Sequence, residues 1–67
     1  MLYGNVKWFN SRKGYGFIER EDGKGDLFVH FDDIVGEGYR TLQAGERVKF
    51  EITKTPKGEK ATNVQRA

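Results

Sequence analysis

Apolar and polar residues alternate along much of this chain, which is the pattern of strands that turn one face inward. The alternation is clearest from Glu46 to Thr53, where Val48, Phe50 and Ile52 are interleaved with charged residues. Similar segments, bounded by turn-forming residues, span residues 2–10, 15–20, 26–30 and 59–65. No long helical periodicity interrupts them. We therefore expect an all-β fold, a five-stranded antiparallel Greek-key barrel of the OB type.

Two places break the simple pattern. Residues 7–9 cannot all follow one face of a strand, so we expect a β-bulge there, of the kind that helps a small barrel to close. After the third strand, Asp32 or Asp33 is expected to cap a short helical turn that brings Ile34 into the core.

The aliphatic residues of these strands suffice for one small core, as suits a chain of 67 residues that we expect to form a single domain over residues 1–67. In the last strand, Thr62 and Val64 are expected to share a face. The expected core residues are Val6, Ile18, Leu27, Val29, Ile34, Leu42, Val48, Phe50, Ile52 and Val64.

Aromatic residues gather in three segments, 7–9, 13–18 and 27–31. Because side chains alternate along a strand, Tyr15 and Phe17 share one face, and Phe28 and the only histidine, His30, share another. Since the aliphatic residues already fill the core, these rings are left facing water. An exposed apolar patch normally marks a binding site, and rings beside cations suit stacked bases and their phosphates.

The same segments carry a family resemblance. GNVKWFN at residues 4–10, KGYGFI at 13–18 and LFVHF at 27–31 resemble the signature of bacterial cold shock proteins, and the last two match the family's two ribonucleoprotein motifs. GEGYRTL at 36–42 and ATNV at 61–64 also fit, so the resemblance covers essentially the whole chain. It implies a cold-shock domain that binds single-stranded RNA and DNA. It also implies an ATP-independent RNA chaperone that affects transcription and translation, as in the cold shock response.

The expected nucleic-acid site combines rings for the bases with lysines for the backbone. Tyr39 enters as the counterpart of a loop aromatic that closes over a base in the family, and Lys57 as the counterpart of a basic hairpin residue. The expected site residues are Lys7, Trp8, Phe9, Lys13, Tyr15, Phe17, Phe28, His30, Phe31, Tyr39 and Lys57.

Several assignments remain open at this point. Phe9 belongs either to the ring face or to the core at the bulge. Arg12 and Lys24 are either phosphate contacts or solvated charges, and Tyr3 is expected to be an ordinary surface residue. The rings also suit a second class of protein, a small barrel that binds peptides or a protein partner.

Composition argues against enzymes and membranes. Net charge is only +2, from 12 basic and 10 acidic residues, so the placement of the cations says more than their number. One histidine without cysteine provides no catalytic triad and no metal site, and Gly14-Tyr15-Gly16 is not a phosphate loop. A nuclease built on Asp22, Asp26, Asp32 and Asp33 is a third class, but turns and caps account for these residues.

We accordingly expect a non-enzymatic binder without metal, cofactor or small-molecule substrate. No apolar run approaches the roughly 20 residues of a membrane span, and the first residues lack the features of a signal peptide. A cytoplasmic monomer is therefore the expectation.

Overall fold

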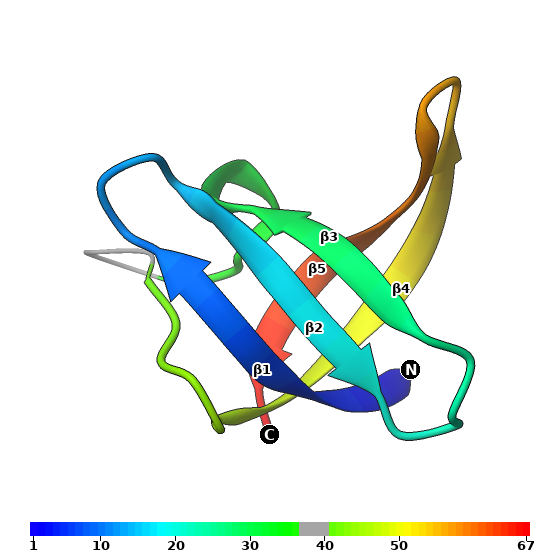
Figure 1. The fold of residues 1–67 in the computed structure, drawn as a ribbon, viewed down its shortest axis with the longest axis horizontal. Coiled ribbons are helices and arrows are strands. Elements are labelled where there is room, and N and C mark those ends of the chain that lie inside the picture. The colour runs from blue at the N-terminus through cyan, green and yellow to red at the C-terminus, as the bar shows by residue number, and fades with distance from the viewer. Residues whose placement is uncertain (37–40) are drawn as a thin grey trace.

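The computed structural model describes residues 1–36 and 41–67 and confirms an all-β barrel (Figure 1). The five strands close in the order β1-β2-β3-β5-β4. Neighbouring strands are antiparallel except β3 and β5, which run parallel where Phe28 faces Lys60. The elements are β1 (Leu2–Asn10), β2 (Tyr15–Arg20), β3 (Asp26–His30), the 3-10 helix η1 (Phe31–Asp33), β4 (Arg47–Thr55) and β5 (Gly58–Arg66).

The predicted boundaries of the first three strands are confirmed residue for residue. The last two strands are longer than predicted, because their pairing continues through Thr55 and Gly58 into the hairpin between them. This β4–β5 hairpin projects beyond the barrel in Figure 1. Within the residues that the structure describes, no helix is long and apolar enough to cross a membrane.

The predicted bulge lies at Lys7 in β1. Val6 is paired with Ile18, but Trp8 is paired with Phe17, so the register shifts by one residue between them. Beyond the shift, Phe9 crosses over Gly16, where an added Cβ would lie 2.2 Å from the Trp8 carbonyl oxygen and 2.7 Å from the Phe9 Cα. Only glycine allows β1 and β2 to approach so closely.

The core matches the expected set with one exchange. Ten of the described apolar residues are buried, among them Val48 and Phe50 of β4, while Ile52 is half-buried against them and Ala61 of β5 is fully buried. The expectation that Thr62 and Val64 share a face is wrong. Asn63 has a left-handed backbone with φ of 51°, and the register of β5 against β4 shifts at this point, so Ala61 and Val64 turn inward instead.

The short helical turn after β3 is confirmed, but its cap differs from the prediction. The Nδ1 of His30 accepts a hydrogen bond from the Asp32 amide at 3.2 Å, so His30 rather than Asp32 or Asp33 is the N-cap. The two aspartates lie inside the helix, where their charge suits its first turn. Ile34 follows and is buried, as expected.

Candidate nucleic-acid interface

Four rings form a closed circuit on the outside of the barrel. Trp8 lies edge-on to Tyr15 with centroids 5.7 Å apart, and Tyr15 lies stacked with Phe28 at 5.9 Å. Phe28 is edge-on to Phe17 at 5.9 Å, and Phe17 returns to Trp8 at 5.4 Å. We call Trp8, Tyr15, Phe17 and Phe28 the ring cluster. Distances of this size are those of favourable aromatic pairs.

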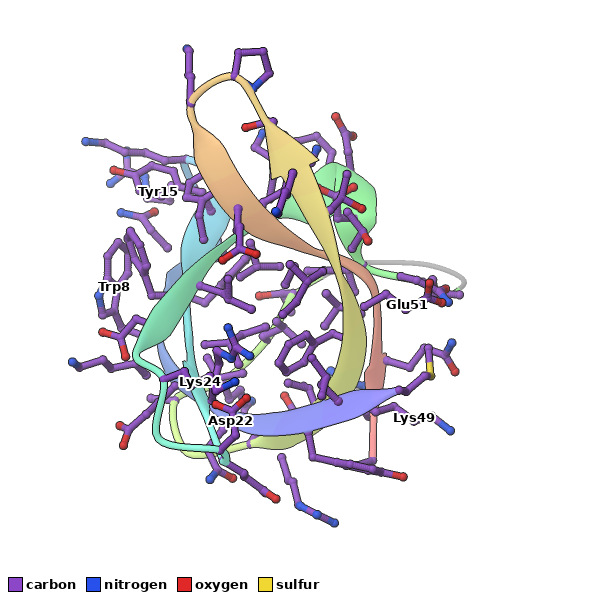
Figure 2. The ribbon with its side chains drawn as sticks, turned by 90° about the vertical axis from the view of Figure 1, so that its right-hand side faces the viewer. Trp8, Tyr15, Asp22, Lys24, Lys49 and Glu51 are labelled. Atoms are coloured by element: carbon purple, nitrogen blue, oxygen red, sulfur yellow. The ribbon has the colours of Figure 1, made fainter. Side chains whose placement is uncertain are left out.

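Strand register places the ring cluster. Residues directly opposite one another on paired strands point to the same face, and Trp8 is opposite Phe17, which is opposite Phe28. Trp8 keeps 41% of its surface exposed, and the other three rings are half-buried by one another. In Figure 2, Trp8 and Tyr15 project from one side of the barrel, whereas Lys49 and Glu51 project from the opposite side. The expectation that these rings lie outside the core is confirmed.

His30 and Phe31 form a second pair of rings, with centroids 4.6 Å apart. His30 lies beside Tyr15 in the strand register, and Phe31 packs over Gly14, where an added Cβ would lie 2.5 Å from the ring. The Phe31 amide also donates to the Gly14 carbonyl at 2.8 Å. His30 Nδ1 lies 3.2 Å from the Asp32 amide and 3.5 Å from the Asp32 carboxylate, so Asp32 holds the imidazole beside Phe31.

One expected site residue, Phe9, is not part of this arrangement. Phe9 lies beyond the bulge, half-buried and packed against the core, which is the alternative left open by the sequence. Tyr39 lies outside the described residues.

Lys7 stands at the bulge, close to the rings but already paired. Its Nζ donates to Asp26 at 3.0 Å, and this hydrogen bond and the carboxylate charge raise the pKa of Lys7 above its usual value. The pair is exposed, so a phosphate can compete with Asp26 for the ammonium group.

Lys13 is held by the turn before β2. The Asn10 side chain accepts the amides of Arg12 and Lys13, both at 3.0 Å, and the Gly14 amide donates to the Asn10 carbonyl at 2.7 Å. These bonds fix the turn while the lysine side chain has no ion-pair partner among the described residues. Arg12 shares that turn. Lys24 lies in the hairpin between β2 and β3, where its amide binds Asp22.

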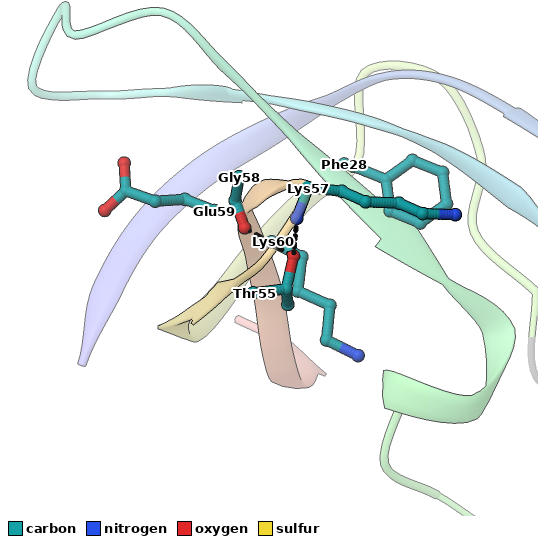
Figure 3. Close-up of a pocket in the computed structure, with 6 residues that line it drawn as sticks. All are labelled: Phe28, Thr55, Lys57, Gly58, Glu59 and Lys60. Atoms are coloured by element: carbon teal, nitrogen blue, oxygen red, sulfur yellow. Dashed lines mark hydrogen bonds between the residues drawn. The ribbon is translucent and has the colours of Figure 1, made fainter.

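Lys57 lies at the tip of the β4–β5 hairpin and lines a pocket with Phe28 (Figure 3). The pocket has a volume of about 360 Å3 and is lined by Phe28, Thr55, Lys57, Gly58, Glu59 and Lys60. This arrangement brings Lys57 to the ring cluster although the two are distant in sequence.

Lys60 is a residue of this pocket that sequence reasoning missed. It is the Cα partner of Phe28 across the parallel junction of β3 and β5. Its ammonium lies 3.2 Å from the Asp33 carboxylate of η1. No local motif signals this position, because it depends on the register between two strands that meet only through the closure of the barrel.

Comparison with known proteins agrees with this geometry. Residues 2–67 match the family model of the "cold-shock" DNA-binding domain. The chain is 54% identical to the probable cold shock protein A of Mycobacterium tuberculosis, over 97% of each chain. It is 59% identical to the cold shock-like protein CspE of Escherichia coli, over 94% of this chain and 91% of that protein.

A solved structure supports the fold independently. The structure titled "drosophila Unr CSD456" superimposes with a TM-score of 0.80, covering 98% of this chain and 26% of that one, at 18% identity. At this identity the likeness speaks for the fold alone. With the family model and the relatives above, the chain belongs to the bacterial cold shock proteins, which are non-enzymatic and bind nucleic acid; the resemblance seen in the sequence and the expectation of a non-enzyme are both confirmed.

Proposed function

We propose that this protein binds single-stranded RNA and DNA by stacking bases on the ring cluster and on the His30–Phe31 pair. The observation that carries the proposal is the closed circuit of four mutually contacting rings on one outer face. Ring faces become available to bases only when the bases are out of a duplex, so unpaired strands are preferred. Tyr39, which the family resemblance brings to the site, completes the proposed set.

Lysines around the rings hold the backbone in this proposal. Lys13 and Lys57 are exposed and reach outward from turns, and Lys7 exchanges Asp26 for phosphate. Phe9 supports base binding indirectly in this proposal, because it packs against the core and holds in place the strand that carries Trp8.

In the cell, we propose that the protein acts as an ATP-independent RNA chaperone that affects transcription and translation, as in a cold shock response. A cytoplasmic location and a single domain fit its bacterial relatives and the absence of cysteine. A monomer fits the closed barrel, in which every strand is paired on both sides.

Titration with oligo-dT tests the proposal directly. Tight binding is expected, whereas a barrel that used its rings for a peptide or protein partner would leave the oligonucleotide free. Loss of intact oligonucleotide in the presence of a divalent metal would instead indicate a nuclease.

Salt dependence is the second expected result. Single strands lose affinity with a log–log slope of about −0.7 for each phosphate neutralised. With roughly two to four contacts from Lys7, Lys13, Arg12 or Lys57, the slope for oligo-dT should lie between about −1.5 and −3. Fluorescence quenching of Trp8 at several salt concentrations measures it. A slope steeper than about −5 would show that charge rather than stacking dominates.

A further inference from the structure

The pocket beside the β4–β5 hairpin continues the ring face past Phe28. Phe28 belongs to the ring cluster and also lines the pocket, so the two surfaces share one side chain. The other lining residues come from the hairpin, which is separated in sequence from the aromatic strands. A strand whose base stacks on Phe28 would therefore pass next to this pocket.

Lys60 stands on the ring side of β5. Because it is the Cα partner of Phe28, the two side chains leave the sheet on the same face. Its neighbour in the opposite strand is Thr53, whereas Glu59 is paired with Lys54 on the other face of the hairpin. In Figure 3 the Glu59 side chain points away from Phe28, although the residue lines the pocket.

Asp33 holds the Lys60 ammonium in place by an ion pair and leaves N–H donors available for another partner. The carboxylate lies 3.2 Å from the ammonium, and the side chains are 18% and 35% exposed, so both are partly withdrawn from water. An ammonium group has three N–H donors, and one carboxylate contact leaves others available. The ion pair thus holds Lys60 beside the pocket with donors to spare.

Thr55 orients the second lysine. Its hydroxyl accepts the Lys57 amide at 3.2 Å and donates to the Gly58 carbonyl at 2.7 Å, which closes the turn from both sides (Figure 3). The Lys57 side chain then extends toward Phe28. Two lysines thus line one pocket that has an aromatic wall, with the Lys57 side chain along Phe28 and the Lys60 ammonium directed toward η1 (Figure 3).

We infer that Lys60 is a phosphate-binding residue, and that the pocket takes the sugar–phosphate of the nucleotide whose base stacks on Phe28, with Lys57 and Lys60 as donors to its oxygens. Phosphate oxygens suit ammonium donors in a partly desolvated pocket. The inference rests on the proposed function and adds one cation and one nucleotide position to it.

The test compares Lys60→Gln with Lys54→Gln in oligo-dT binding across salt concentrations. Both variants lose one positive charge from the same hairpin, but Lys54 does not line the pocket. Lys60→Gln should lower affinity about threefold to tenfold at low salt and make the slope shallower by about 0.7. Lys54→Gln should change the slope little, and Lys60→Arg should restore most of the affinity.

Lys60→Gln also removes the ion pair with Asp33, so folding of each variant is checked by circular dichroism. A measurement on the unsubstituted protein avoids the issue: the side-chain NMR signals of Lys60 should shift on oligo-dT addition more than those of Lys54. If the protein binds oligo-dT but Lys60 and Lys54 behave alike in both experiments, the inference is overturned. If the protein does not bind oligo-dT at all, the proposed function has failed instead.

Discussion

An RNA hairpin with a stem of a few base pairs is expected to open as this protein is added, without ATP and without a metal ion. A protein that binds only the open state shifts the equilibrium by RT ln(1 + [L]/Kd), which is about 2.7 kcal/mol at one hundred times Kd. Two binding sites on an opened hairpin would double the shift to about 5 kcal/mol. Since a base-pair step is worth about 1.4 kcal/mol in DNA, a short stem should open and a long stem should stay closed.

A fluorophore and a quencher at the two ends of the RNA report the opening. Fluorescence should rise with protein concentration for the short stem, stay low for a long stem of the same loop, and stay low for the short stem with Phe17→Ala. A short hairpin that stays closed, at a protein concentration that saturates the unpaired control strand, would leave only passive binding and refute the chaperone proposal.

Replacing a ring of the cluster is expected to weaken binding strongly while sparing the fold. Base–aromatic stacking is worth about 1–3 kcal/mol per base, so Phe17→Ala and Phe28→Ala should each reduce oligo-dT affinity by about tenfold or more. The fold should survive, because both rings lie outside the buried core and the residues beneath them, such as Ile18 and Val29, remain packed.

Tyr3 provides a matched control for these variants. The two residues are exposed to nearly the same degree, Tyr3 at 40% and Trp8 at 41%, but the Tyr3 ring lies 4.4 Å from the Arg47 guanidinium and outside the ring cluster. Tyr3→Ala should bind oligo-dT like the parent. Thermal unfolding and fluorescence titration separate the outcomes: a ring variant that unfolds was part of the core, and one with unchanged affinity does not contact the ligand.

The first three strands and the ring cluster could be predicted because they depend on local order. Alternating residues bounded by turn formers set their ends, and period-2 parity put Tyr15 and Phe17 on one face. The exposed face then followed from counting which aliphatic residues the core needs. Such reasoning works wherever a strand keeps its regular pleat.

The rest depends on contacts between distant segments or on one unusual backbone angle. Because Asn63 has a left-handed backbone, Ala61 and Val64 face the core and Thr62 does not. An asparagine in a strand is not a sufficient sequence signal for such a bulge. The Lys7–Asp26 and Lys60–Asp33 pairs join residues that only the closed barrel brings together. Neither ion pair could therefore be predicted from the sequence.

The extra residue at Lys7 ties binding to folding through a single insertion. Upstream of it β1 buries Val6, and downstream of it the same strand presents Trp8 outward and sends Phe9 to the core over Gly16. If Lys7 instead joined a regular pleat after Val6, Trp8 would turn inward and Phe9 outward, placing an indole in the space of a phenyl ring and a phenyl ring on the surface. Residues 7–9 and Gly16 thus constrain one another, because the same bulge decides which ring faces outward and which one crosses over the glycine.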